Sequence, residues 1–127
     1  MASLTKRKLD HFGIKFNSKE KINLIRFDTY WNKSNASNID LIKIDVEGHE
    51  LSVLHGLGEY LVRTKLIQFE FGGCNIDTRT YFQDFWYFFT DNDFSIYRIT
   101  PTGTYRINSY KEQDEIFRTT NYIAVNN

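Results

Sequence analysis

The stretch IDLIKIDVEGHE, residues 39–50, indicates the fold class more clearly than any other part of the chain. From Ile39 to Val46 the side chains alternate between two faces until Gly48 interrupts them, and this period of two predicts a strand. The apolar residues between positions 51 and 61 then follow helical spacing, which predicts a helix that bends or breaks near Gly56. A strand that leads directly into a helix is the beginning of an α/β unit.

A second strand and a second helix follow the first pair. Residues 66–71 alternate in the same way, and two glycines end this strand. The aromatic run over residues 81–89 has a helical period, and Asp77 or Thr78 is placed to cap its first turn. These rings are expected to be buried core rather than a stacking platform for a base or a cofactor.

The end of the chain predicts two more strands, over residues 94–99 and 122–125. The order strand, helix, strand, helix, strand is that of an α/β domain whose first strands are parallel and whose crossovers are right-handed. Pro101 and Gly103 follow the third strand, and no long helical pattern precedes the last one. These two strands are therefore expected to form an antiparallel hairpin at the edge of the sheet.

The beginning of the chain is less regular than the rest. Residues 1–21 are polar with scattered apolar positions and predict no defined element. The apolar residues within 22–27 predict a short strand, and Ser34, Asn35, Ser37 and Asn38 mark a polar connection to the next strand. A basic cluster at residues 6–8 is given no function, because such short runs are usually solvated. With 127 residues, the chain is expected to form a single domain over residues 1–127.

The composition excludes several function classes. Sixteen basic residues balance sixteen acidic ones, so no field of one sign exists to attract nucleic acid. No stretch approaches the roughly 20 apolar residues of a membrane span, and no membrane partner is expected. Cys74 is the only cysteine, which favours a reducing compartment and a soluble, cytoplasmic protein. His49 and His55 do not share a helix face, which argues against a metal site built on them.

Four carboxylates are predicted to converge at one edge of the sheet. Asp45 and Glu70 end successive strands, and Glu47 and Glu50 lie in the loop and the first helical turn after Asp45. Ligands of parallel α/β sheets bind outside the carboxyl ends of the strands, so this edge is the predicted site. The electrostatics of a helix N-terminus explain Glu47 and Glu50 equally well. Asp45 ends an apolar strand and therefore needs either a partner such as Lys43 or a function.

Residues 39–50, with Val53, Leu54 and Gly56 after them, resemble the signature of the FkbM-type methyltransferases. The resemblance extends over nearly the whole chain. Further segments that match the family are Phe27-Asp28, residues 68–73, residues 120–125 and the stretch Ala2-Ser3-Leu4, which is similar to one found internally in that family.

The resemblance implies the C-terminal half of a Rossmann-like methyltransferase sheet. It also implies transfer of a methyl group from S-adenosylmethionine, typically to a hydroxyl of a sugar or a natural product. By the same resemblance Asp45, Glu47 and Glu70 are the expected catalytic residues, with Asp45 beside the methyl-bearing end of the cofactor, where it would orient or deprotonate the acceptor hydroxyl. The residues expected to bind this small-molecule or glycan acceptor are Glu50, Gly72 and Gly73.

The chain departs from the family pattern where most of the cofactor would be bound. It has no glycine-rich turn after an opening strand, and no acidic residue ending a following strand to hold the ribose. It is therefore expected to be a truncated form, whose incomplete sheet favours self-association or pairing with a complementary N-terminal half. Two alternatives stay open. One is a non-catalytic remnant or interaction module, and a weaker one is a metal-dependent hydrolase that uses Asp45 and Glu47.

Overall fold

The computed structural model describes residues 3–33 and 37–127. Its strands are β1 (Ile39–Ile44), β2 (Thr64–Phe71), β3 (Phe94–Thr100), β4 (Gly103–Ile107) and β5 (Thr120–Asn126). Its helices are α1 (Phe27–Trp31), α2 (Glu50–Gly56), α3 (Gly73–Thr78) and α4 (Phe82–Thr90), with the short 3-10 helices η1 (Asp10–Phe12), η2 (Gly58–Tyr60) and η3 (Glu112–Asp114). None of these helices is long and apolar enough to cross a membrane. Ala2, Ser34 and Asn35, which entered the sequence predictions, lie outside the described residues.

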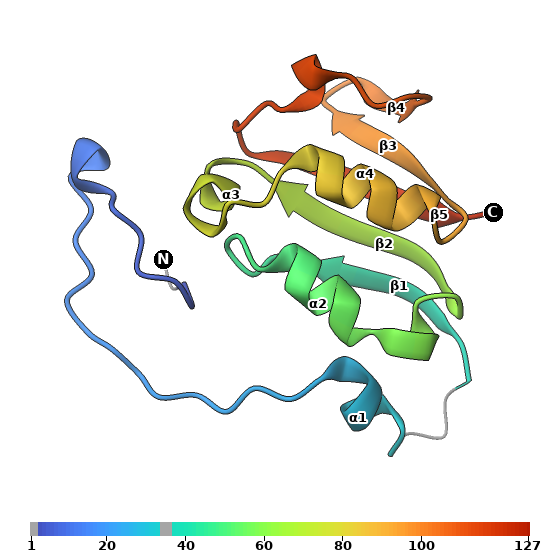
Figure 1. Cartoon of the computed structure of the whole chain (residues 1–127), viewed down its shortest axis with the longest axis horizontal. Helices are drawn as coiled ribbons and strands as arrows, with labels where there is room; N and C mark the ends of the chain where they lie inside the picture. The colour runs from blue at the N-terminus through green and yellow to red at the C-terminus, as the bar shows by residue number, and fades with distance from the viewer. Residues whose placement is uncertain (1–2, 34–36) are drawn as a thin grey trace.

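The strands form one sheet in the order β1-β2-β5-β3-β4 (Figure 1). β1 and β2 are parallel, as the sequence predicted, and β5 is antiparallel to both β2 and β3. β1, β2 and β3 therefore run in one direction, and their carboxyl ends lie at the same edge of the sheet. The mixed α/β architecture is confirmed, and this edge is the one at which ligands of such sheets bind.

The third and last predicted strands do pair antiparallel, but their predicted place at the edge of the sheet is wrong. β5 lies between β2 and β3, where Tyr122 and Ala124 are almost fully buried. The hairpin at the edge is formed instead by β3 and β4, which pair from Ile96 with Ile107 to Thr100 with Gly103. The sequence did not predict β4, because every residue of this strand except Ile107 is exposed and no apolar alternation marks it.

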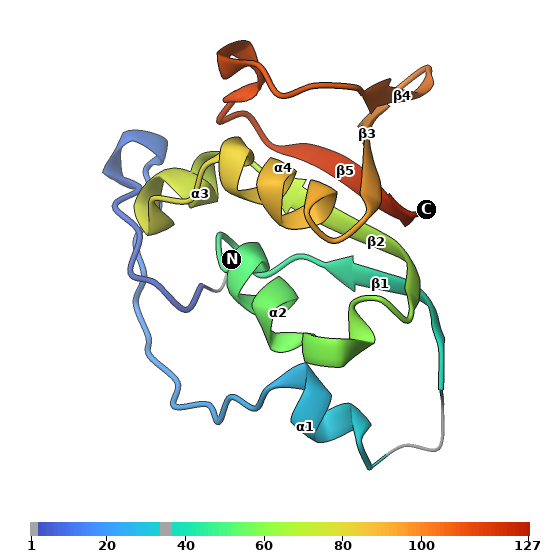
Figure 2. The ribbon, with the colours of Figure 1, turned by 45° about the vertical axis from the view of Figure 1, so that its right-hand side comes forward.

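The core lies between the sheet and the two helices α2 and α4, which cover one face (Figures 1 and 2). Phe69 of β2 is its centre: its ring lies 5.0 Å from the rings of Phe85 and Phe89 and 5.4 Å from that of Tyr122. Phe82, Phe85 and Phe89 are fully buried, which confirms that the aromatic run of α4 is core. These ring contacts hold β2 in a fixed position against α4 and β5, and they therefore fix the position of the residues at its carboxyl end.

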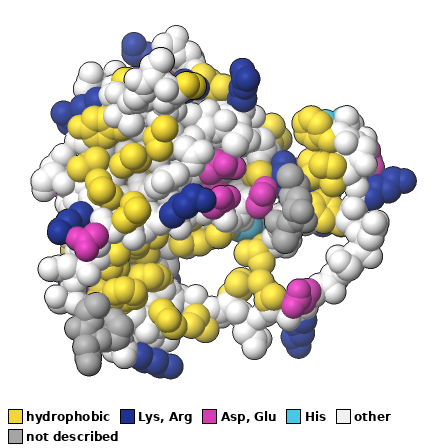
Figure 3. Space-filling view, turned by 180° about the vertical axis from the view of Figure 1, so that it is seen from behind, with side chains coloured by type: hydrophobic (Ala, Val, Ile, Leu, Met, Phe, Trp, Pro, Cys, Tyr) yellow, Lys and Arg dark blue, Asp and Glu magenta, His cyan; other side chains and the backbone are white. Residues whose placement is uncertain are grey.

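No helix of the described residues covers the opposite face of the sheet. Figure 3 views the molecule from behind and shows hydrophobic side chains on this side. Leu41 of β1 is 56% exposed and Leu66 of β2 is 37% exposed. β1 pairs only with β2 within the described sheet, so its outer edge keeps backbone groups that are free to pair. A bare face beside an open edge is typical of a sheet that another segment or chain completes.

The strand expected within residues 22–27 does not form. Ile22, Leu24 and Ile25 lie in an irregular segment with exposures of 52%, 70% and 68%, and Phe27 begins α1. A strand needs a neighbour for its backbone hydrogen bonds, and none of the described strands lies alongside this segment. α1 packs instead near α2 and η2, and the rings of Phe27 and Trp31 stack at 5.2 Å.

Two predicted helix boundaries have different outcomes. The helix after β1 ends at Gly56, as predicted, and η2 follows it. The predicted cap of the aromatic helix is wrong, because Asp77 and Thr78 belong to the separate helix α3. Glu115 accepts hydrogen bonds from the first two N–H groups of α4, at Phe82 and the next residue, both at 2.8 Å. A distant carboxylate thus satisfies N–H groups that a local cap was expected to satisfy.

Candidate functional site

The four carboxylates predicted to converge come together at the carboxyl ends of β1 and β2. Asp45 directly follows β1, Glu47 lies in the next turn, Glu50 is the first residue of α2, and Glu70 is near the end of β2. The charges of Asp45, Glu47 and Glu50 all act on Glu70, so the four groups influence one another electrostatically. Figure 3 shows acidic side chains gathered near the centre of the rear view.

Glu70 is a half-buried member of this carboxylate cluster. Burial raises the pKa of its carboxyl group above the ordinary value, and the negative charges of Asp45, Glu47 and Glu50 raise it further. Lys43 acts in the opposite direction but does not cancel this rise. A raised pKa means that the carboxylate binds a proton more tightly than an ordinary glutamate does.

Asp45 has the partner Lys43 that the sequence indicated, but it is exposed and not partly buried at the end of the apolar strand. Its side chain is 46% exposed and accepts a hydrogen bond from the Lys43 ammonium at 3.0 Å. The reason is that β1 ends at Ile44, so Asp45 stands beyond the apolar part of the strand. An ion pair this exposed contributes at most about 1 kcal/mol, so the Asp45 carboxylate can exchange Lys43 for another partner at little cost.

Glu47 is held in place by two side chains from other parts of the chain. Its Oε2 accepts a hydrogen bond from the Cys74 thiol at 2.8 Å and lies 3.4 Å from Nη1 of Arg7. Its φ of 56° is in the left-handed region, which is unusual for a residue with a side chain. Burial and the bond to Glu47 raise the pKa of Cys74 to about 12, so the sulfur is a neutral thiol that donates its proton to Glu47.

Glu50 points into the protein and braces the turn that carries Glu47. It is 2% exposed, and its Oε1 accepts hydrogen bonds from the N–H groups of Val46 and Gly48, both at 3.1 Å. Its Oε2 is buried and has no hydrogen-bond partner among the described residues. The position of Glu50 therefore indicates a role in shaping the turn after β1, in contrast to the exposed position of Asp45.

An N-terminal strap, residues 3–9, lies across this edge of the sheet and was missed by sequence reasoning (Figures 1 and 2). Arg7 is its main contact: Nε bonds Asp77 at 2.7 Å and Nη1 bonds the Cys74 sulfur at 3.0 Å. Thr5 and His49 form a further hydrogen bond of 2.8 Å. The Arg7 side chain is only 8% exposed, whereas the basic residues on either side of it are exposed. After the strap the chain stands away from the body, and Figure 3 shows an opening between them.

The two glycines after β2 have different surroundings. A Cβ on Gly72 would lie 2.7 Å from Cα of Thr119, so the absence of a side chain lets the chain before β5 pack directly on this turn. A Cβ on Gly73 would meet nothing closer than the Phe117 carbonyl oxygen at 3.7 Å. The N–H of Gly72 donates to Oδ1 of the buried Asn75 at 2.9 Å. Gly72 is thus required by packing, and Gly73 is not.

Replacing Gly72 by alanine should lower the free energy of unfolding by about 1–3 kcal/mol, because the new methyl group would overlap backbone atoms that cannot easily move. Gly73→Ala is the matched control. Gly73 begins α3 and has room for a methyl group, so its replacement should change stability by about 0.5 kcal/mol or less. Urea denaturation of both variants measures the difference. Equal losses of unfolding free energy in the two variants would show that the close contact between Gly72 and Thr119 does not exclude a side chain at position 72.

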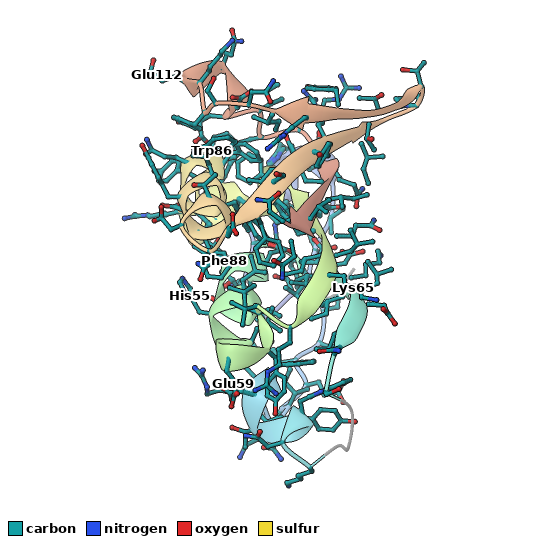
Figure 4. All side chains as sticks on the ribbon, turned by 90° about the vertical axis from the view of Figure 1, so that its right-hand side faces the viewer. His55, Glu59, Lys65, Trp86, Phe88 and Glu112 are labelled. Carbon is teal, nitrogen blue, oxygen red and sulfur yellow. The ribbon has the colours of Figure 1, made fainter. Side chains whose placement is uncertain are left out.

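The two histidines considered as metal ligands lie in different surroundings. His49 bonds Thr5, while the ring of His55 on α2 meets the ring of Phe88 on α4 edge to face at 5.0 Å (Figure 4). Across residues 3–33 and 37–127, no group of three or more His, Cys, Asp or Glu side chains is arranged to hold a metal ion.

Comparison with known proteins identifies a family that matches the chain. The family model described as "Methyltransferase FkbM domain" matches residues 2–96 of the chain. This stretch contains all six predicted site residues and ends within β3, before β4 and β5. No curated protein and no solved structure matches the chain.

Proposed function

We propose, starting from the fact that this chain belongs to the FkbM methyltransferase family, that it supplies the acceptor end of an S-adenosylmethionine-dependent O-methyltransferase site. The acceptor would be a hydroxyl group of a sugar or a natural product. The single observation that carries the proposal is the family match over residues 2–96, which includes the carboxylate cluster at the carboxyl edge of β1 and β2.

The residues present fit one end of the cofactor only. Asp45 is exposed at the carboxyl edge of β1, where it can face a ligand, and its charge acts on Glu70. The backbone N–H groups of Val46 and Gly48, however, both donate to Glu50 and are not free to bind a ligand. β1 is also the last strand of the described sheet, so no strand beyond it carries further binding turns. Most of the groups that bind the cofactor would have to come from a further segment beside this edge.

The chemistry assigned to this chain is orientation and deprotonation of the acceptor. Bound S-adenosylmethionine would supply an electrophilic methyl group on a positively charged sulfur. Asp45 would leave Lys43 and accept a hydrogen bond from the acceptor hydroxyl within about 2.6–3.2 Å, and would take the hydroxyl proton when the methyl group passes from the cofactor sulfur, which keeps the electron pair of the broken bond, to the acceptor oxygen. Glu70, with its raised pKa, would receive or share that proton, and Glu47 would keep the turn after β1 in shape.

The partner that completes this enzyme would pair with the outer edge of β1 and cover the bare face of the sheet. Leu41, 56% exposed on that strand, supports this assignment, because a second segment beside β1 would bury it. A reducing compartment such as the cytoplasm suits a chain with one cysteine, Cys74, held as a neutral thiol.

The proposed function is tested by supplying a cofactor-binding segment. The chain is produced together with the glycine-rich N-terminal part of an FkbM-family methyltransferase, and transfer of a labelled methyl group from S-adenosylmethionine to simple sugars is measured. We expect labelled product and S-adenosylhomocysteine from the assembled pair and from neither part alone. An assembled, folded pair that releases no S-adenosylhomocysteine would contradict the proposal and favour a non-catalytic interaction module.

A further inference from the structure

A hollow of about 570 Å³ lies at the same edge of the sheet, between the end of β3 and the beginning of β5. Arg98 and Arg118 line it together with groups that can donate hydrogen bonds, among them Tyr105, Thr119 and Asn121. None of these residues was a predicted site residue, and the composition of the hollow differs from that of the carboxylate cluster. The hollow is lined by cationic groups and neutral hydrogen-bond donors, whereas the cluster consists of carboxylates.

The hollow is adjacent to the proposed acceptor site. In the pairing of β2 with β5, Asn121 stands directly opposite Glu70, and Thr120 stands opposite Phe71. Opposed residues of antiparallel strands have Cα atoms about 4.5–5.5 Å apart, so the lining of the hollow begins one strand away from Glu70 at the carboxyl edge. Arg98 pairs with the buried Tyr122 and so faces the helix-covered side, whereas Glu70 faces the bare side, and a ligand that reaches both passes over this edge. Thr119, also in the lining, is the residue that packs against Gly72.

The two arginines of the hollow form no ion pair within the described residues. Nη1 of Arg98 donates to the Tyr105 hydroxyl at 3.3 Å, and within residues 3–33 and 37–127 neither Arg98 nor Arg118 forms an ion pair. Asp114 is the acid whose charge acts on Arg98, and its carboxylate already accepts a hydrogen bond from the Lys111 N–H at 2.9 Å. Arg7, Arg26 and Arg63, in contrast, are each paired with a carboxylate.

We propose that this hollow binds a phosphoryl group of the acceptor. Guanidinium groups match the oxygens of a phosphate with paired, charge-assisted hydrogen bonds, and hydroxyl and amide donors complete the shell. The acceptor class then becomes a phosphorylated sugar or alcohol, with its anionic group in the hollow and its hydroxyl at Asp45 and Glu70. The identity of the bound compound as an acceptor rests on the proposed function, whereas binding of phosphate in the hollow does not.

Calorimetric titration of the full chain with glucose 1-phosphate and with glucose, at low ionic strength, tests the site. Glucose has no phosphate for the two arginines to bind, so glucose 1-phosphate should bind at least about tenfold more tightly than glucose. Arg98→Gln and Arg118→Gln should each remove most of this difference. Arg106→Gln is the control, because Arg106 lies on β4 outside the lining and bonds Ser95 at 2.8 Å.

The outcomes separate this inference from the proposed function. Equal binding of glucose and glucose 1-phosphate, or an equal effect of Arg106→Gln, would overturn the phosphate site. Tighter binding of glucuronate than of glucose 1-phosphate would overturn it in favour of a carboxylate ligand. Phosphate binding that depends on Arg98 and Arg118 would support the site even if no methyl transfer were ever observed, since the titration requires no catalysis.

Discussion

Replacing Asp45 by asparagine should lower methyl transfer by the completed enzyme by about 10²- to 10⁴-fold, the usual contribution of a general base. The substitution keeps the shape of the side chain and removes its charge. The rate is measured with the assembled pair at saturating cofactor, so that a loss of chemistry is not confused with a loss of binding.

The fold should survive this substitution. Asp45 is exposed beyond the end of β1, and its ion pair with Lys43 contributes about 1 kcal/mol at most. Asp40→Asn is the matched control, because Asp40 is an exposed acid of the same strand, pairs with Lys65 at 2.7 Å, and lies away from the carboxyl edge. It should leave the rate unchanged. A rate for Asp45→Asn within a few-fold of the original would eliminate Asp45 as the base and leave Glu70 in that role.

The parts of the fold that the sequence predicted are those set by local patterns. β1, β2 and β3 and the end of α2 at Gly56 follow from apolar periods and a glycine within the segment itself. The insertion of β5 between β2 and β3 depends instead on pairing between distant segments, which no local pattern specifies. Residues 22–27 have a local apolar pattern that predicted a strand, but no described strand lies beside them to pair with, so most of this segment stays irregular.

The same distinction applies to the candidate site. The convergence of Asp45, Glu47 and Glu70 follows from the rule that parallel strands end at one edge, and it could be predicted. The contact between Arg7 and Glu47 joins residues 40 positions apart and could not. In the structure alternate positions of residues 5–9 face inward, with Arg7 between exposed lysines, but the sequence TKRKL has no alternation of polar and apolar residues that indicates this. The buried position of Glu50 was hidden because its partners are backbone N–H groups of the preceding turn.

The isolated chain should bind S-adenosylmethionine with a dissociation constant near millimolar or weaker. In this class of fold, a glycine-rich turn lets the backbone approach the cofactor and an acidic side chain holds the ribose hydroxyls, and the sequence carries neither. If each missing hydrogen bond costs on the order of 1 kcal/mol, three or four of them convert a micromolar site into one near millimolar. The N–H groups of Val46 and Gly48 cannot compensate, because Glu50 already holds them.

Titration calorimetry of the 127-residue chain with S-adenosylmethionine at millimolar concentration is the most direct test of the proposal that these residues provide the acceptor end of a methyltransferase site and not a complete cofactor site. We expect little or no heat from the chain alone and a clear binding isotherm once the glycine-rich N-terminal part of an FkbM-family methyltransferase is added. A dissociation constant in the low micromolar range for the chain alone would mean that it carries a complete cofactor site, and would contradict the assignment of that site to a further segment.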